Sequence, residues 1–353
     1  MLRSIVLKTI AIIKKKREAN RFFSHQKNTF NKDAHAIRSA NRLGFTIDES
    51  VIYRFPQNNP HKYISEFERY LLRQHLSEKG ILLDNKIVFY HLIRPYAPVN
   101  LIYGYKSGNS DFVWMENRFD NPLDLIVKAG KICYKMIASG CGEGFHVLEY
   151  RNDHFFIDRN PSSQDSILKL LASKNYFLET YCHQSDFENA IFAGAVNTIR
   201  IITLTDADGK DRIVCSLHRF GSSADAIVDN ASAGGLFSMI DTKTGRLDAA
   251  ISYAALNSAD EKSVQFPVHP VTGVQIEGVI IPHWDTITDK VLSLHRQLRF
   301  CGLSFIAWDI AHTNNGFIIV EGNLTSSVDL LQANGGLRDG YLGNYYRRMG
   351  IID

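Results

Sequence analysis

The chain of 353 residues has few cysteines and none of the spacings that disulfide-rich or zinc-binding proteins show. Its five cysteines form no CxxC pair and are scattered over the sequence, at Cys133, Cys141, Cys182, Cys215 and Cys301. An odd, scattered set is typical of reduced thiols in a cytosolic protein and argues against a disulfide framework or a cysteine-based zinc site. The sequence also contains no internal repeat and no low-complexity segment.

An excess of charge of one sign is also missing. The formal net charge is +3, from 40 Lys and Arg against 37 Asp and Glu, so we expect no general attraction to nucleic acid. With 45% hydrophobic and 22% charged residues, the composition is that of an ordinary soluble globular protein. The length allows two or three domains, or one large domain with lobes.

No hydrophobic run near the N-terminus is long enough to span a bilayer. The stretch MLRSIVLKTIAIIKKKREANR is basic and apolar, but Lys8 interrupts its apolar part, and no small-residue cleavage site follows. We favour a helix that packs on the body of the protein with its basic residues 14–17 solvated. The alternative is an interfacial helix on an anionic membrane surface. We therefore expect a cytoplasmic protein. The alternative is a cytoplasmic protein that also contacts the inner face of the membrane.

The order of the predicted elements indicates an α+β protein. Residues 1–80 are mostly helical in character, and the apolar spacing within 61–80 predicts a helix that ends at Gly80. From about residue 176 onward, predicted strands dominate, with one helix at about 285–300. These strands are YFLETYC, TIRIITL, RIVCSLHRF, GVIIP, LSFIAWDIA and GFIIVEGN. The pattern predicts a C-terminal antiparallel sheet.

The segment FIAWDIAHTNNGFIIVEGN, residues 305–323, predicts a hydrophobic hairpin that carries carboxylates. A three-residue loop at 314–316 would place Ala311 opposite Ile319 and Asp309 opposite Glu321. Asn323 would share the face of Glu321, because side chains alternate along a strand. A buried unpaired carboxylate is costly, so a basic side chain, a solvent cleft or a metal ion must compensate these charges. Such oxygen ligands suit magnesium; an exposed hairpin edge with solvated acids is the alternative.

A second segment, ICYKMIASGCGEGFHVLEY at residues 132–150, combines a lysine with a cluster of glycines. A predicted strand ends at Lys135, a loop of small residues covers 139–144, and a second strand starts at Phe145. Glycines allow backbone N–H groups to approach phosphate oxygens, and the lysine adds a point charge. The lysine precedes the glycines and strands flank both sides, so this is not a Walker A motif. A glycine-rich turn without a ligand is the alternative.

Together, the lysine with its glycine hairpin and the distant Asp…Glu-x-Asn hairpin resemble the ATP-grasp superfamily. Further segments resemble one branch, the sugar-transfer-associated ATP-grasp family, also labelled alpha-L-glutamate ligase-related. They are AVNTIRIITL (195–204), HRFGSSADAIVDNASAGGLFSMID (218–241) and HPVTGVQIEGVIIPHWD (269–285). The resemblance covers roughly residues 45–330 and implies the ATP-grasp fold, in which two α+β lobes clamp ATP and magnesium between antiparallel sheets. Met136, where the family usually has proline, and Glu143 in the loop depart from its pattern.

The resemblance also implies domains and binding residues. It implies a helical N-terminal region over 1–80, a small lobe with the phosphate loop over 81–178, and a C-terminal lobe with the metal and substrate site over 179–353. It implies that ATP is bound by Lys86, Lys135, Ser139, Gly140, Gly142, Gly144, Glu179, Thr180 and Tyr181. The two lysines would contact the α- and β-phosphates, and residues 179–181 would contact adenine. Asp309, Glu321 and Asn323 would bind one or two Mg²⁺ ions that bridge the β- and γ-phosphates.

The expected catalytic residues are Arg200, Arg219 and Asn230. Arg200 lies between apolar neighbours on a predicted strand and needs a partner, and its planar fork suits a γ-phosphate or acyl-phosphate oxygen. Arg219 would hold a substrate carboxylate, with a structural salt bridge as the alternative. Asn230 would lie near the acceptor or the γ-phosphate, with Ser232 and the amides of residues 234–235, for which a plain tight turn is the alternative. The histidines at 218, 269 and 283 lack metal-like spacing, and we expect pocket or structural roles for them.

The resemblance implies an ATP- and Mg²⁺-dependent carboxylate–amine ligase that acts through an acyl phosphate. Its partners would be ATP, a small or sugar-linked carboxylate and an amine such as an amino acid. The family's association with sugar transfer points to surface or exopolysaccharide assembly, and to a polysaccharide-synthesis complex as a second partner for the basic N-terminal helix. One alternative is a kinase-like protein that phosphorylates a sugar hydroxyl. Another is a non-catalytic nucleotide-binding module, against which the intact trio at 309, 321 and 323 argues.

Overall fold

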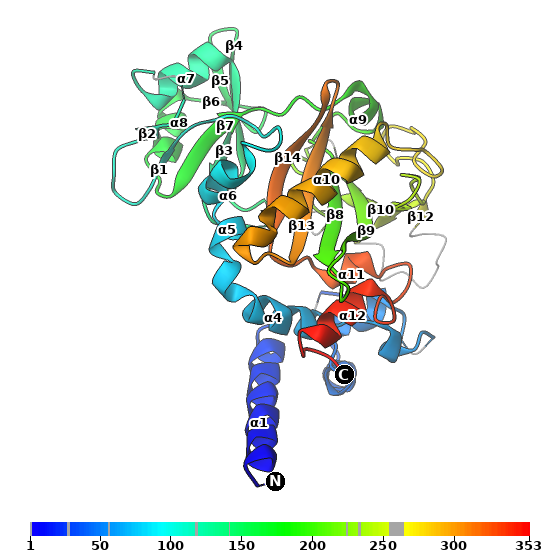
Figure 1. Ribbon diagram of the computed structural model, residues 1–353. Coiled ribbons are helices and arrows are strands. Elements are labelled where there is room, and N and C mark those ends of the chain that lie inside the picture. Colours follow the sequence, from blue (N-terminus) through cyan, green and yellow to red (C-terminus); the bar gives the residue numbers. More distant parts are fainter. Residues whose placement is uncertain are drawn as a thin grey trace.

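The computed structural model describes residues 2–26, 29–55, 57–116, 119–140, 142–223, 225–231, 234–253 and 265–353, with side chains from residue 13 onward. Cys141 and Ser232 lie outside these described residues. The described residues form two sheets of seven strands each, in which the paired strands are antiparallel, together with helices on the sheets and at one end of the molecule (Figure 1). The α+β class predicted from the sequence is confirmed.

The first sheet has the strand order β2-β1-β7-β3-β4-β5-β6. Its strands are β1 (Ile102–Lys106), β2 (Val113–Trp114), β3 (Lys131–Met136), β4 (His146–Arg151), β5 (His154–Ile157), β6 (Asn160–Ser162) and β7 (Tyr176–Thr180). Helices α7 (Pro122–Ala129) and α8 (Gln164–Leu171) pack on it and bury Leu125, Ile126 and Ile167 completely. The Asn121 side chain caps α7 by accepting two backbone N–H bonds, and this fixes where the helix begins.

The second sheet has the order β12-β11-β10-β9-β8-β13-β14. Its strands are β8 (Thr198–Thr205), β9 (Asp211–Phe220), β10 (Leu236–Met239), β11 (Ala250–Ser252), β12 (Gln265–Phe266), β13 (Phe305–Thr313) and β14 (Gly316–Asn323). Helix α10 (Trp284–Leu298) crosses this sheet and buries Ile287, Val291 and Leu294 against it (Figure 1). The predicted C-terminal antiparallel sheet and the helix near 285–300 are confirmed. The predicted strand GVIIP is wrong, because Ile280 forms only an isolated bridge with Arg246.

The β13–β14 hairpin has the predicted pairing at its functional end but not at its turn. The strands close around residues 314–315, with Thr313 opposite Gly316, so the loop is one residue shorter than predicted. Ile310 pairs with Ile319, and Ala311 pairs with Ile318 rather than with Ile319. A bulge follows, and it restores the predicted pair of Asp309 with Glu321. Because a one-residue slip moves side chains to the other face of a sheet, this bulge is what brings both carboxylates to one place.

Several helices gather at the end of the molecule from which α1 extends (Figure 1). They are α1 (Leu2–Ser24), α2 (Ala34–Arg42), α3 (Ile47–Ile52), α4 (Glu66–His75), α11 (Val328–Leu331) and α12 (Tyr341–Arg348). Helices α5 (Ile81–Asp84) and α6 (Lys86–Ile93) pack on β14, and α9 (Asp186–Ile191) lies beside the second sheet. The predicted stop at Gly80 is wrong: α4 ends at His75, and Gly80 has a right-handed φ of −55° directly before α5. The predicted division of the chain after residues 80 and 178 stays a prediction.

The N-terminal helix α1 packs on α4 through its last turns and extends away from the sheets (Figure 1). The Phe22 ring lies 5.5 Å from the ring of Phe67 and 5.3 Å from that of Tyr70. In the part of the chain that the structure describes, no helix is long and apolar enough to cross a membrane. Contact of α1 with a membrane surface or with a partner complex stays a prediction.

Candidate active site

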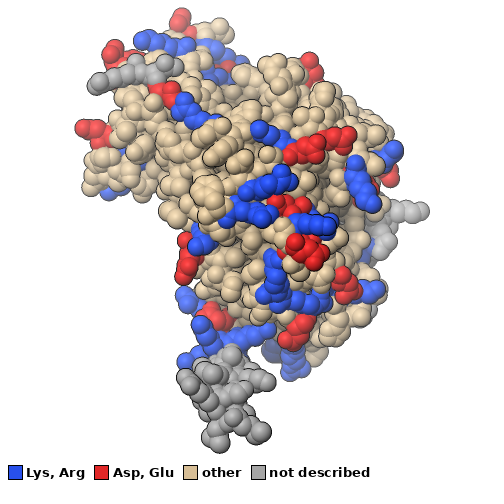
Figure 2. All heavy atoms as spheres, in the orientation of Figure 1, with Lys and Arg blue, Asp and Glu red and all other residues tan. Residues whose placement is uncertain are grey.

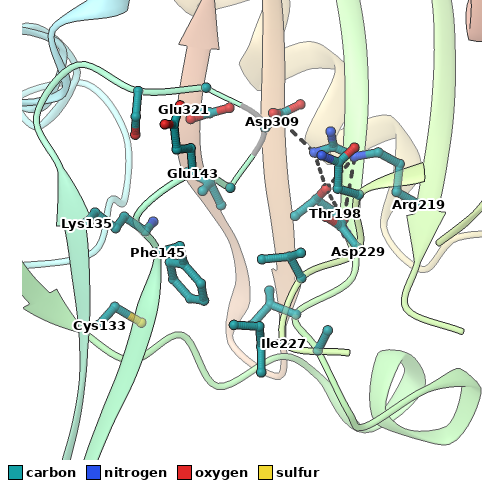
Figure 3. Close-up of a pocket in the computed structure, with 18 of the residues that line it drawn as sticks. Cys133, Lys135, Glu143, Phe145, Thr198, Arg219, Ile227, Asp229, Asp309 and Glu321 are labelled. Atoms are coloured by element: carbon teal, nitrogen blue, oxygen red, sulfur yellow. Dashed lines mark hydrogen bonds and ion pairs between the residues drawn. The ribbon is translucent and has the colours of Figure 1, made fainter. Parts of the chain in front are cut away.

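A cavity of about 510 Å³ lies where the loop after β3 faces the second sheet (Figure 3). The structure brings most of the expected site residues to this cavity. They are Lys86, Lys135, Ser139, Gly140, Gly142, Glu179, Tyr181, Arg200, Arg219, Asn230, Asp309, Glu321 and Asn323. Two expected residues, Gly144 and Thr180, do not line it. The Thr180 hydroxyl instead accepts a hydrogen bond from the backbone N–H of Leu101 at 3.1 Å.

The glycine loop after β3 depends on glycine at two positions. Gly142 and Gly144 have φ of +75° and +66°, the left-handed region that side chains avoid. A Cβ at position 144 would also lie 2.4 Å from Cγ of Met136. Met136, the departure from the family pattern, therefore packs against Gly144, and Gly144 shapes the loop without lining the cavity. A Cβ at Gly140 would meet nothing within 4 Å, so the backbone is open at that position.

Lys135 lies on β3 and is held by a carboxylate from β7. Its Nζ lies 2.6 Å from Oε1 of Glu179, which also accepts a hydrogen bond from Asn100 at 3.2 Å. Burial alone would lower the pKa of Lys135, but the Glu179 carboxylate more than offsets burial, so the pKa is raised. Lys135 thus stays positively charged at the wall of the cavity.

Lys86 connects the glycine loop to the hairpin. It occupies the first position of α6, where the Asn85 side chain caps the helix. Its Nζ donates to the carbonyl oxygen of Ser139 at 2.5 Å and lies 3.8 Å from Oε2 of Glu321. The two expected phosphate-binding lysines therefore reach the same cavity from different elements, one from a helix and one from a strand.

Apolar side chains form one wall of the cavity, near the residues that are expected to contact adenine. Phe145 and Ile227 line the cavity, as do Val147 and Val228 (Figure 3). The Lys131 ammonium lies 4.0 Å from the centre of the Tyr181 ring, a cation–π contact that fixes the ring at the edge of this wall. Apolar side chains with a fixed aromatic ring suit a flat heterocycle.

Two arginines compensate the negative charge of Asp309. It lies opposite Arg200 where β13 pairs with β8, and Arg200 binds it through two parallel bonds, Nε to Oδ1 at 2.7 Å and Nη2 to Oδ2 at 2.6 Å. Nη2 of Arg219, on β9, lies 3.1 Å from the same Oδ2. Burial would raise the pKa of Asp309, but the two guanidinium groups more than offset it and lower that pKa. Of the three compensations considered from the sequence, a basic side chain is the one that Asp309 has.

Arg219 has a second acidic partner that the sequence did not single out. Its Nε lies 3.5 Å from Oδ2 of Asp229, and the same nitrogen donates to Oγ1 of Thr198 at 3.0 Å (Figure 3). Asp229 in turn accepts a hydrogen bond from the backbone N–H of Thr198 at 2.9 Å. Burial would lower the pKa of Arg219, but the two carboxylates more than offset this and raise it. The structural salt bridge considered for Arg219 is therefore present.

Glu321 is the carboxylate that faces the cavity with fewer partners. Its side chain is 29% exposed, against 3% for Asp309, and Lys86 at 3.8 Å is its nearest basic group. Asn323 donates a weak hydrogen bond to it at 3.4 Å. Burial and the negative charge of Asp309 raise the pKa of Glu321.

The hairpin residues fit a magnesium ion through their chemistry. Two opposed carboxylates and an amide oxygen are hard ligands, and a cation between the carboxylates would relieve their repulsion. Among the residues that the structure describes, no group of three or more His, Cys, Asp and Glu side chains could hold a metal. A magnesium ion here would be held by Glu321 and Asn323, and Asp309 would be shared between the ion and its arginines.

The remaining expected residues lie near the site or outside it. Asn230 lines the cavity next to Asp229, whereas the amides of Gly234 and Gly235 donate to the carbonyls of residues 231 and 230 in a tight turn, at 3.1 and 3.0 Å. None of the three histidines lines the cavity. His218 is fully buried, and its Nε2 lies 2.8 Å from Glu188. On the face shown in Figure 2, basic and acidic side chains are interleaved across the middle of the described surface.

Sequence reasoning missed one whole end of the cavity. Arg69 on α4, Tyr253 after β11, and Ser327 and Asp329 around α11 also line it. These residues come from three distant segments, so only the tertiary fold brings them together. Asp329 follows the expected metal ligands closely in the sequence, and this proximity is the one signal that pointed to it.

Comparison with known proteins identifies the family. The model of the sugar-transfer associated ATP-grasp family matches residues 66–340, well over half of the chain. A comparison with curated protein sequences gave no match.

Solved structures with a similar fold include the ATP-grasp ligase PsnB with its minimal precursor, Mg and ADP (12% identity, TM-score 0.39, 77% of this chain and 59% of that one). The ADP complex of PurK, N5-carboxyaminoimidazole ribonucleotide synthetase, is 12% identical (TM-score 0.41, 74% and 53%). D-alanine–D-alanine ligase from Bacillus anthracis is 11% identical (TM-score 0.36, 70% and 58%). The chain thus spans less than two thirds of the length of each of these structures. On the family match, the chain belongs to the sugar-transfer associated ATP-grasp family.

Proposed function

We propose that the protein is an ATP- and Mg²⁺-dependent ligase that joins a carboxylate to an amine through an acyl phosphate. The observation that carries the proposal is the cavity, in which Lys86, Lys135 and the glycine loop face the paired carboxylates Asp309 and Glu321. Phosphoryl transfer depends on positioning and charge neutralisation more than on covalent chemistry from the protein. Lysines, arginines and oxygen ligands in one cavity meet that need, and membership of the ATP-grasp family supports the same activity.

The nucleotide would lie along β3 and β7. Lys86 and Lys135 would contact the α- and β-phosphates, and backbone N–H groups of the loop at Gly140 and Gly142 would cradle them. The apolar wall around Phe145 would hold adenine. Because Lys135 remains protonated beside Glu179, this arrangement supplies a fixed positive charge for the phosphates.

The reacting groups would lie next to the hairpin and β8–β9. Arg200 and Arg219, oriented by Asp309, would stabilise negative charge on the transferred phosphoryl group or on the carboxylate substrate. Magnesium bound by the hairpin residues would neutralise the β- and γ-phosphates. Asn230 would contact the acceptor at the same place.

We infer the class of the two substrates from the family description. The association with sugar transfer supports a uronic acid or another sugar-linked carboxylate, joined to an amine in surface or exopolysaccharide assembly. A cytoplasmic location, with α1 at a membrane or a synthesis complex, fits that role.

A hydroxylamine-trapping experiment tests the proposal. The protein is incubated with Mg-ATP, hydroxylamine and one of four carboxylates (glucuronate, galacturonate, D-glutamate or L-glutamate), and hydroxamate and phosphate are measured. A ligase gives both products, and Lys135→Met abolishes them, whereas Lys169→Met, an exposed lysine on α8, retains them. A stable phosphoester without hydroxamate would indicate the kinase-like alternative. No turnover, with nucleotide still bound, would indicate the non-catalytic module.

A further inference from the structure

The cavity has a second end, whose residues have no role in the function proposed above. Its lining comes from α4, from the end of β11 and from the segment around α11, and it includes Arg69, Tyr253, Ser327 and Asp329. Since both ends belong to one cavity, a molecule bound at this second end would face the phosphate and metal residues. The side chains at this second end therefore indicate which kind of acceptor the proposed ligase would take.

Two of the charged groups at this end neutralise each other. Nε of Arg69 lies 2.5 Å from Oε2 of Glu66, which precedes it on the same face of α4. The other oxygen of Glu66 accepts hydrogen bonds from the Ser327 hydroxyl at 2.7 Å and from the backbone N–H of Val328 at 2.6 Å. Glu66 and Arg69 thus form a satisfied pair that fixes α11 against α4.

Asp329 has no such basic partner among the described residues. Its Oδ1 accepts hydrogen bonds from the Ser327 hydroxyl and the Leu330 N–H, both at 2.7 Å, whereas Oδ2 has only the Tyr253 hydroxyl at 3.5 Å. Among the described residues, no Lys, Arg or His nitrogen lies within 4 Å of this carboxylate. Burial, and then the negative charge of Glu66, raise the pKa of Asp329 to about 6. Among the described residues, Asp329 is therefore a carboxylate at the cavity wall without an ion-pair partner of its own, because the nearby Arg69, whose charge lowers this pKa, is bonded to Glu66.

We propose, building on the ligase function above, that Asp329 binds the ammonium group of the amine acceptor at this end of the cavity. An ammonium would supply the missing positive charge, would bond to Oδ2, and would have the Tyr253 ring and hydroxyl beside it. A second carboxylate here would be repelled by Asp329. The acceptor is therefore a primary amine, and the acyl donor lies with Arg200 and Arg219.

The same carboxylate accounts for the proton that the amine must lose. Asp329 takes one proton from the ammonium, and the freed nitrogen lone pair attacks the acyl-phosphate carbonyl. The C–N bond forms, the C–O bond to the phosphate breaks, and the second nitrogen proton leaves with the phosphate. The amide, hydrogen phosphate and protonated Asp329 are the products of this step, and charge and protons balance.

The test measures amine binding directly by calorimetry, with and without Mg-ATP, on the full chain. The probes are glycine, L-alanine, ethanolamine and D-glucosamine, each compared with its oxygen counterpart: glycolate, L-lactate, ethylene glycol and D-glucose. We expect at least one amine to bind at least about tenfold more tightly than its counterpart, and Asp329→Asn to remove that preference. Tyr253→Phe should weaken the same amine by a smaller factor.

Controls separate this inference from the ligase proposal and from misfolding. Asp289→Asn carries the same substitution at an exposed position on α10 and should leave amine binding unchanged. Mg-ATP affinity of Asp329→Asn should stay within about twofold of the wild type, which also shows that the variant is folded. The inference is overturned if no amine is preferred, or if Asp329→Asn keeps the preference. If the wild type does not bind Mg-ATP at all, that result counts against the ligase proposal instead.

Discussion

Replacing Asp309 by alanine should destabilise the protein strongly, because two half-buried arginines would lose their shared, buried partner. The Asp309 side chain is 3% exposed, and those of Arg200 and Arg219 are 17% and 13% exposed. The substitution removes two bonds to Arg200, at 2.7 and 2.6 Å, and one to Arg219, at 3.1 Å. Arg219 keeps Asp229 as a partner, whereas Arg200 loses its only carboxylate ion-pair partner among the described residues, and removing one partner of a buried ion pair costs about 3–5 kcal/mol.

The free energy of unfolding would be measured by urea denaturation, followed by both tryptophan fluorescence and circular dichroism so that coincident transitions establish two-state behaviour. Asp309→Asn keeps one acceptor oxygen and should lose less than Asp309→Ala. Asp289→Ala, an exposed aspartate on α10, serves as the control and should change stability by less than about 0.5 kcal/mol. A loss below about 1 kcal/mol for Asp309→Ala would refute the view that Asp309 holds the two arginines.

Other predictions concern the loop, the phosphate lysine and the second end of the cavity. Gly144→Ala should cost about 1–2 kcal/mol, from its φ of +66° and its contact with Met136, while Gly140→Ala should change the denaturation midpoint little. Lys135→Met should weaken ATP binding at least about tenfold in calorimetry, because it removes a protonated group from the cavity wall. The pKa of Asp329 is raised to about 6, against 3.8, so the folded state holds this proton more tightly than the unfolded state does. As the pH rises from about 4 to about 6, the free energy of unfolding of the wild type should therefore fall relative to that of Asp329→Asn. Urea denaturation at several pH values measures this difference. Burial and then Glu66 raise the pKa that sets this window, whereas the hydrogen bonds from Ser327 and Leu330 and the charge of Arg69 lower it.

The sequence predicted the parts of the site that local pattern determines. The alternation of the hairpin placed Asp309 opposite Glu321, and the apolar surroundings of Arg200 required a partner for it. The identity of that partner was out of reach, because Asp309 and Arg200 lie 109 residues apart and meet only when β13 pairs with β8. The turn was predicted one residue too long, and the bulge that corrected the register leaves no mark in hydrophobic alternation.

The residues that were missed share one property. Asp229 follows an apolar stretch and Asp329 follows two serines and a valine, so both look like ordinary acidic residues in the sequence. Their roles depend on Thr198, Arg219 and Tyr253, which other segments supply. The helix end predicted at Gly80 was wrong for a related reason. Helix α5 starts directly after that glycine and packs on β14, so tertiary contacts decide the local conformation.

The most direct test of the central claim is calorimetric binding of Mg-ATP to the wild type, to Glu321→Ala and to Glu277→Ala. Glu321 faces the cavity opposite Asp309, whereas Glu277 is exposed outside it. The account predicts that the wild type and Glu277→Ala bind Mg-ATP alike, that Glu321→Ala loses at least about tenfold in affinity, and that the difference shrinks when magnesium is removed. Equal binding of Mg-ATP by all three proteins, or no binding by the wild type, would contradict the claim that this hairpin holds the metal of a nucleotide site.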